Sequence, residues 1–248
     1  MTNSASFSVG GLPDGVLLVD KPAGLTSHDV VDRLRRRFRI AKVGHAGTLD
    51  PQATGLLVIM LGRATKLANR LMAGDKIYEG TLHLGITTDS QDGEGKILQE
   101  RDFRHVTQTD LIQAFGRLTG DIMQTPPMVS AVKKNGIPLY KLARKGKVVE
   151  RQPKLIHIYE FNLLNFNPPE AAFRIRCSKG VYVRTICHDV GEALQCGAYL
   201  AALRRTGSGA FGIEQAHPLD KLLTLDRAEI LPLVIPSPRI PLQAVADG

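Results

Sequence analysis

Residues 42–61 read KVGHAGTLDPQATGLLVIML, a loop of small and polar residues followed by the longest uninterrupted apolar run of the chain, residues 56–61. Such a run predicts a buried strand. Three glycines between positions 44 and 55 allow backbone conformations and close approaches that a Cβ atom would block. In this loop Pro51 biases Asp50 toward an extended conformation. A carboxylate held rigidly there can act as a nucleophile or a base, or it can simply cap a turn.

The sequence on the N-terminal side of this loop predicts a strand and then a helix. Residues 15–20 (GVLLVD) are typical of a short buried strand, and the KPAGLTS that follows predicts a turn. Ser27 is expected to cap a helix whose apolar positions share one face, namely Val30, Val31, Leu34 and Phe38. The other face is basic, and residues 33–42 contain no acid; its bases are Arg33, Arg35, Arg36, Arg37, Arg39 and Lys42.

The sequence on the C-terminal side predicts strands and helices in irregular order. Strands are expected at 76–86, 155–166 and 171–177, and helices at about 64–71, 109–118 and 184–195. Many strands without strict strand–helix alternation indicate an α+β fold around a largely antiparallel sheet. The GSGAFG at 207–212 predicts a tight turn rather than a dinucleotide loop, because Pro218 prevents a long helix there. The acidic turn at 89–94 lacks the ligand spacing of a calcium loop and is expected to be a hydrated turn.

Basic residues concentrate in segment 125–154. It contains eight lysines and arginines against one acid, Glu150, in a chain whose net charge is +8. Four prolines interrupt this segment, and only residues 139–145 in its middle are expected to be helical. Together with the basic helix face, this charge indicates a polyanionic partner, most often a nucleic acid. The alternative is a solvated basic surface.

Composition excludes several classes of protein. With 43% hydrophobic and 23% charged residues, the chain is expected to fold rather than stay disordered. No apolar run approaches the ~20 residues of a membrane helix, and the N-terminus lacks the features of a signal peptide. The three cysteines, Cys177, Cys187 and Cys196, have neither disulfide-frame nor zinc spacing. We therefore expect a cytoplasmic protein with reduced thiols, no metal and no nucleotide cofactor.

The two ends of the chain are expected to differ from its middle. Residues 1–14 are expected to be a flexible N-terminus. Residues 213–248 contain five of the fourteen prolines and more acids than bases. This shift in composition predicts a separate, poorly regular C-terminal appendage.

Five blocks of sequence resemble one known family. The GHAGTLDPQATG of the central loop, with KPAGLTSHDVV upstream, resembles the signature of pseudouridine synthases, specifically the bacterial TruB family that modifies uridine 55 of tRNA. The blocks that agree in order after it are KIYEGTLHLGITTDSQDGEG (76–95), QTPPMVSAVKKNGIPLYKLARKG (124–146), CSKGVYVRTICHDVGEAL (177–194) and LRRTGSGAF (203–211). The resemblance implies a pseudouridine synthase fold over residues 15–212, with an inserted basic thumb at about 125–154. The sequence departs from larger members of the family, many of which have a C-terminal domain of the PUA type, because the segment after Gly212 is expected to be too short for a full domain of that kind.

The resemblance implies a role for each of several residues. Asp50 would be the nucleophile that attacks the uracil ring or the ribose of a flipped-out uridine, so that the base rotates and rejoins through carbon 5 without cofactor or metal. Tyr78 would stack on the target base, and Arg184 would pair with the aspartate and keep it ionised. His45, Tyr182 and Leu203 would hold or line the pocket for the flipped base.

The resemblance also implies the partner. The thumb would clamp the T arm of tRNA, and the basic helix is expected to contact the RNA as well. The enzyme is expected to act as a monomer in the cytoplasm. The bases expected to contact this RNA are Lys133, Lys134, Arg144, Lys145, Lys147, Arg36 and Arg37. The alternative that remains is a catalytically silent RNA-binding or tRNA-folding protein, which would need the basic segments but not Asp50, Tyr78 and Arg184 together.

Overall fold

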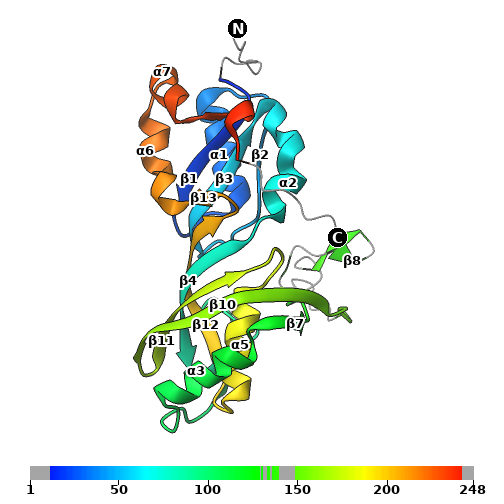
Figure 1. Cartoon of the computed structure of the whole chain (residues 1–248), viewed down its shortest axis with the longest axis vertical. Coiled ribbons are helices and arrows are strands. Elements are labelled where there is room, and N and C mark those ends of the chain that lie inside the picture. The colour runs from blue at the N-terminus through cyan, green and yellow to red at the C-terminus, as the bar shows by residue number, and fades with distance from the viewer. Residues whose placement is uncertain (1–11, 129, 131–132, 135, 140–148, 242–248) are drawn as a thin grey trace. The chain divides into compact units, whose positions relative to one another are not determined.

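The computed structural model describes residues 12–128, 130, 133–134, 136–139 and 149–241, and the chain forms two compact units (Figure 1). The first unit contains the chain up to Tyr78 and again from Arg204 onward, and the second contains Glu79–Leu203. Two strands, β4 (Lys76–Leu84) and β12 (Ala198–Ser208), each begin in one unit and end in the other. Both boundaries between the units lie inside the predicted 15–212 domain, and the first unit also contains residues beyond 212.

A sheet with two buried faces forms the centre of the first unit. β1 (Gly15–Lys21) pairs antiparallel with β3 (Thr54–Leu61), and β3 pairs in parallel with β12. Short strands extend these three: β2 (Val43–His45), β13 (Phe211–Gly212), β14 (His217–Pro218) and β15 (Ile235–Pro236). Alternate residues of β3 enter two separate cores, so that Leu57 and Ile59 pack in one and Leu56 and Val58 in the other. This explains the unbroken apolar run, since both faces of the strand are covered.

Helix α1 (Ser27–Phe38) covers one face of this sheet. Thr26, not Ser27, is its N-cap: the Thr26 side chain accepts a hydrogen bond from the Asp29 amide, and the Thr26 amide donates to the Asp29 carboxylate. The predicted apolar face is confirmed, because Val30, Val31, Leu34 and Phe38 are all buried. The Ser27 hydroxyl is therefore available for contacts elsewhere.

Residues beyond 212 are more regular than their composition suggested. They form α6 (Leu219–Thr224) and α7 (Arg227–Ile230), with short 3-10 turns at Ile213–Gln215, Leu231–Leu233 and Ser237–Arg239. Leu219, Leu222 and Ile230 join the same core as α1, and so does Leu12 near the other end of the described chain. Leu219 and Leu222, three positions apart, form the apolar side of α6. This spacing is typical of a helix, whereas the expectation of an irregular segment was based on its prolines.

The second unit contains the strand order β12-β4-β11-β10-β7. Its further strands are β5 (Ile86–Thr88), β6 (Ile97–Glu100), β7 (Gly120–Gln124), β10 (Lys154–Asn167) and β11 (Glu170–Cys177), and its helices are α3 (Gln108–Arg117) and α5 (Val183–Ala193). Phe115 of α3 stacks on Phe161 at 3.8 Å between ring centres, and Phe173 meets both rings edge-on. Ile112 of α3 is 52% exposed, whereas Leu111, Ala114 and Phe115 are buried.

Other elements among the described residues are a 3-10 helix at Gly62–Leu67, α2 (Ala68–Ala73) and the hairpin of β8 (Lys133–Lys134) and β9 (Ile137–Pro138). The pairings are mostly antiparallel, which confirms the expected α+β class. The tight turn predicted at 207–212 is confirmed as the turn between β12 and β13. In the part of the chain that the structure describes, no helix has the length and apolar character needed to cross a membrane.

Candidate active site

The loop that contains Asp50 connects β2 to β3. Each backbone carbonyl of residues 47–51 accepts a hydrogen bond. Nη2 and Nη1 of Arg205 donate to the carbonyls of Gly47 at 3.2 Å and Thr48 at 3.5 Å. The amide of Ala53 donates to the Asp50 carbonyl at 3.1 Å. A loop whose carbonyls are all satisfied by fixed donors has little freedom to rearrange.

Ser27 fixes the middle of the loop from the first turn of α1. Its hydroxyl accepts from the amide of Leu49 at 2.8 Å and donates to the Leu49 carbonyl at 3.3 Å, and the side chain is buried. The sequence indicated Ser27 only as a helix cap. Because Thr26 takes that role, the Ser27 hydroxyl links the helix to the residue directly before Asp50.

Lys21 holds the loop directly after Asp50. Its fully buried ammonium donates to the carbonyls of Pro22 at 2.9 Å, Leu25 at 2.7 Å and Pro51 at 2.9 Å. Burial lowers the pKa of Lys21 to about 8, while the negative charge of Asp50 acts in the opposite direction. Lys21 is thus both a clamp on Pro51 and a cation within electrostatic reach of the Asp50 carboxylate.

His45 and Tyr78 are the other predicted site residues of the first unit. His45 ends β2, and its pKa lies below the usual value because of burial and the nearby charge of Arg205. The imidazole is therefore neutral near pH 7, when it can both donate and accept a hydrogen bond. Tyr78 lies in the first-unit part of β4 and is 8% exposed.

Arg184, Tyr182 and Leu203 lie in the second unit. The buried Arg184 forms an ion pair with Asp92, with 3.4 Å between Nη1 and Oδ2, and its guanidinium lies 5.7 Å from the Tyr182 ring centre. Leu203 is part of β12 and is half-buried. The structure therefore brings Tyr182 and Arg184 together, whereas the predicted pairing of Asp50 with Arg184 stays a prediction.

The acidic turn at 89–94, expected to be merely hydrated, is joined to its surroundings. The amide of Gly93 donates to the Leu200 carbonyl at 3.2 Å, and the amide of Leu200 donates to the Gln91 carbonyl at 3.0 Å. Thr185 of α5 donates to the Gln91 side chain at 2.7 Å. The turn is thus fixed against both β12 and α5, which explains how Asp92 reaches Arg184.

Gln124 orients Tyr182 through a contact that no sequence pattern predicted. The Tyr182 amide donates to Oε1 of Gln124 at 2.9 Å, and Nε2 of Gln124 donates back to the Tyr182 carbonyl at 3.1 Å. Gln124 is buried at the end of β7. This two-way amide contact fixes the backbone directly before Arg184.

The predicted RNA-binding bases have different surroundings. Arg36 and Arg37 are both exposed on α1, but Arg37 donates to the carbonyls of Leu223 at 2.7 Å and Leu225 at 2.5 Å. Arg37 therefore has a role within the fold, at the C-terminal end of α6. Lys133 and Lys134 form β8, whereas the predictions for Arg144, Lys145 and Lys147 lie outside the described residues.

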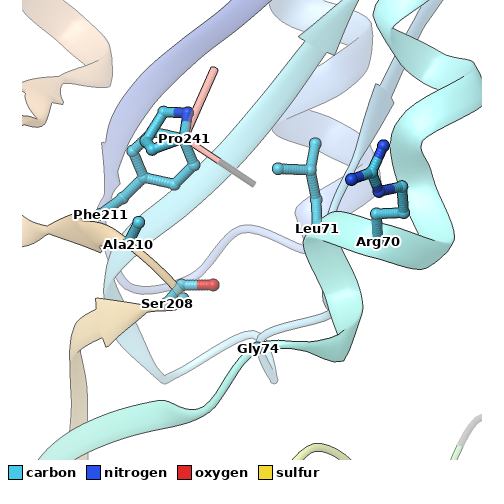
Figure 2. Close-up of a pocket in the computed structure, with 8 residues that line it drawn as sticks. Arg70, Leu71, Gly74, Ser208, Ala210, Phe211 and Pro241 are labelled. Carbon is cyan, nitrogen blue, oxygen red and sulfur yellow. The ribbon is translucent and has the colours of Figure 1, made fainter. Parts of the chain in front are cut away.

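A pocket in the first unit lies between α2 and the turn after β12 (Figure 2). Leu71 and Arg70 line it on one side and Phe211 and Pro241 on the other, with Ser208 nearby. Its volume of about 10 Å³ has room for about one water molecule. It is too small for a nucleoside base. Among the described residues, no group of three or more His, Cys, Asp or Glu side chains is placed to bind a metal ion.

Comparison with known sequences matches most of the chain to two family descriptions and to several named relatives. Residues 35–183 match the family described as TruB family pseudouridylate synthase (N terminal domain), and residues 184–236 match the tRNA pseudouridylate synthase B C-terminal domain. The chain is 52% identical over 220 residues to the tRNA pseudouridine synthase B of Opitutus terrae, covering 89% of each. It is 49% identical over 208 residues to the protein of the same name from Pseudomonas aeruginosa, covering 84% of this chain and 68% of the other.

Solved structures with the same fold have longer chains. One belongs to the crystal structure of a Cbf5-Nop10-Gar1 complex, with a TM-score of 0.68 and 29% identity, covering 90% of this chain and 60% of that one. Another belongs to the structure of an H/ACA RNP bound to a substrate RNA containing 2'-deoxyuridine, with a TM-score of 0.65 and 26% identity. That match covers 90% of this chain and 59% of the other, so the chain described here spans about three fifths of these structural relatives.

Proposed function

Because this chain belongs to the TruB family of pseudouridylate synthases, we propose that it converts uridine to pseudouridine at position 55 in the T loop of tRNA. At the coarser level of the family, the chain is an enzyme, a tRNA pseudouridine synthase, and its fold is the pseudouridine synthase fold. The observation that supports the site is the loop of residues 47–51, where each backbone carbonyl accepts a hydrogen bond and the charge of Asp50 acts on the buried Lys21.

In this proposal Asp50 is the nucleophile. The target uridine leaves its stack, at a cost of ~a few kcal/mol, and enters the enzyme's pocket. Attack of the carboxylate on the uracil ring or on the ribose carbon leads to cleavage of the glycosidic bond. The base then rotates and rejoins the ribose through carbon 5, and the bond to Asp50 breaks so that the free carboxylate is restored. The proton of carbon 5 is released while nitrogen 1 gains one. No atom is gained or lost in the net reaction, so it consumes no oxidant, reductant or second substrate, and the resemblance to the family implies that it needs neither a cofactor nor a metal.

The fixed loop backbone supports this role for Asp50. A nucleophile must meet the reacting carbon in one orientation, and a displacement of about 1 Å can cost ~100-fold in rate. Lys21 contributes a positive charge near Asp50, and a nearby cation favours the ionised, nucleophilic form of a carboxylate. The proposal gives Tyr78 the role of stacking on the target base and His45, Tyr182 and Leu203 the role of holding it. The proposal gives Arg184, which pairs with Asp92 in this structure, the role of pairing with the aspartate and keeping it ionised.

The proposal extends to the RNA partner and the organisation of the chain. Residues 15–212 would act as one catalytic domain with the basic segment 125–154 as its thumb, and the T arm of tRNA would be the part that is gripped. Phosphate contacts of such a segment give affinity and orientation rather than sequence reading. We also expect the enzyme to work as a monomer in the cytoplasm.

Tritium release tests this function directly. A tRNA transcript labelled with tritium at carbon 5 of uridine should lose label only when the bond to carbon 5 forms. We expect release from the normal transcript and none above background from a transcript with cytidine at position 55. Tight binding of both transcripts without any release would favour the alternative, a catalytically silent RNA-binding protein.

A further inference from the structure

Arg205 is the largest fully buried side chain of the described chain, and its guanidinium touches both ends of the Asp50 loop. Nε donates to the carbonyl of Leu56 at 2.7 Å, at the start of the apolar run. Nη2 and Nη1 donate to Gly47 and Thr48, before Asp50. The exposed fraction of Arg205 is 0%. A single planar group therefore fixes the distance between the segments that enter and leave the loop.

The glycines of the loop fit closely against Arg205. Gly55, with φ of +99°, is the register partner of Arg205, and a Cβ atom there would lie 2.3 Å from the Arg205 carbonyl oxygen. Gly47, with φ of +107°, would place a Cβ atom 3.5 Å from Nη1 of Arg205. Both conformations favour glycine. The glycines that marked this loop in the sequence thus allow the backbone to close on the Arg205 residue.

The charge of Arg205 extends beyond its hydrogen bonds. Its described hydrogen-bond acceptors are backbone carbonyls, which carry no full negative charge. The positive charge nevertheless acts on His45, at the end of β2 before the loop, and on Lys21, which donates to Pro51, and in both it favours the neutral form. Arg205 therefore contributes to the potential around Asp50 as well as to the shape of the loop.

We propose that Arg205 is a positioning residue for catalysis: its buried guanidinium fixes the Asp50 loop so that the carboxylate is held in the orientation needed for attack. This inference rests on the proposed function, because it needs Asp50 to be the reacting group. Arg205 would contribute to the chemical step without touching the RNA. Its loss should lower the rate of the chemical step and leave RNA affinity nearly unchanged.

Lysine is the informative replacement at this position. Arg205→Lys keeps the positive charge, but a compact ammonium cannot span carbonyls on both sides of the loop as the guanidinium fork does. Arg205→Met removes the charge as well and should be the more damaging change. The fall in rate from wild type to Arg205→Lys therefore measures the geometric contribution of the guanidinium. The further fall from Arg205→Lys to Arg205→Met measures the contribution of the charge.

The experiment measures single-turnover tritium release at saturating tRNA, the dissociation constant for the same tRNA, and hydrogen exchange of peptides covering residues 46–53. For Arg205→Lys we expect a rate at least about tenfold lower, a dissociation constant within about threefold of wild type, and faster exchange confined to the loop. Arg227→Lys is the matched control, because Arg227 also donates to a backbone carbonyl, that of Phe38 at 2.8 Å, far along the chain from the loop. Its rate and its loop exchange should equal those of wild type.

A folded Arg205→Lys variant with a wild-type single-turnover rate would overturn the proposal. So would exchange that rises evenly over the whole first unit, because Arg205 would then support the fold in general. If the variants do not fold, exchange in the wild-type protein decides: the amides of Ala46, Leu49 and Ala53 should be as protected as those of β3. Rapid exchange there would refute a fixed loop. Absence of tritium release by wild type would refute the proposed function instead, since loop exchange is measured without activity.

Discussion

Arg184 and Asp92 form an ion pair within the second unit although 92 positions separate them in the sequence. The guanidinium is 4% exposed and the carboxylate 22%. A buried cation that loses its carboxylate becomes strongly unfavourable, so removal of one partner disturbs the other. Asp92 therefore controls how Arg184 is oriented.

We expect Asp92→Asn to lower the single-turnover rate of pseudouridine formation by about tenfold or more, because the amide cannot offset the charge of Arg184. Tritium release at saturating tRNA measures the effect. Asp89→Asn is the matched control: Asp89 accepts from the Lys96 amide at 2.9 Å in the same turn but is not the acid paired with Arg184. Equal losses in the two variants would show that the turn matters only for folding.

Asp50→Asn is expected to abolish pseudouridine formation while leaving tRNA affinity within about threefold of wild type. The amide has nearly the shape of the carboxylate but is not a nucleophile. Tritium release and a binding titration on one preparation measure both quantities. Substantial turnover by a variant shown by mass spectrometry to be free of deamidated protein would contradict the role of Asp50.

The pH dependence should reveal Lys21. Its pKa of about 8 in the folded protein lies below the ordinary value of 10.5, so the ammonium loses its proton as the pH rises through about 8. A neutral amine has only two hydrogens for the three carbonyls of Pro22, Leu25 and Pro51, and it no longer offers a charge to Asp50. We expect the single-turnover rate to fall between pH 7 and pH 9.5.

As the pH rises, the effect of Lys21 on stability is opposite in sign to its effect on the reaction rate. Between pH 8 and 10.5 the unfolded state binds more protons at Lys21 than the folded state, so this residue makes the free energy of unfolding rise with pH. Loss of rate should therefore not be accompanied by unfolding due to Lys21. Lys21→Arg should remove the fall in rate and Lys66→Arg, at an exposed lysine, should keep it. A fall that persists in Lys21→Arg would assign the titration to another group.

Neutralising Lys133, Lys134, Lys145 and Lys147 should weaken tRNA binding and reduce its salt dependence. Each phosphate contact that is lost removes about one unit from the slope of log affinity against log salt. Binding titrations at several salt concentrations measure this slope, with Lys66→Gln plus Lys221→Gln as the control. A slope equal to that of wild type would assign the charge of segment 125–154 to a solvated surface.

Activity is expected to survive EDTA and exhaustive dialysis. The sequence contains no HxxxH pair or cysteine pair with metal-ligand spacing, and the proposed reaction needs neither redox nor hydrolytic chemistry. Tritium release before and after chelation is the measurement, with a monovalent salt buffer that keeps tRNA folded. Activity that disappears and is restored by one specific metal ion would refute this expectation.

The sequence by itself determined the local features of the first unit. Apolar runs and the spacing of apolar residues on one helix face predicted β1, α1 and β3 to within a few residues. Such patterns are informative because each strand or helix must bury its apolar side. The glycines and Pro51 singled out the Asp50 loop, because these residues restrict or release the backbone directly. The cap of α1 was predicted one residue late, since Thr26 and Ser27 are both good caps and only the fold shows which hydroxyl has another partner.

Only the tertiary structure decided which residues hold that loop and the second part of the site. Arg205 reaches Gly47 because β12 lies in register beside Gly55, and Asp92 reaches Arg184 because its turn is bonded to β12 and α5. The tail packs on α1 for a similar reason, since its leucines complete an apolar core formed largely by residues near the other end of the chain. Such pairings depend on strand register and on packing between distant segments, and no local pattern of residue types encodes either.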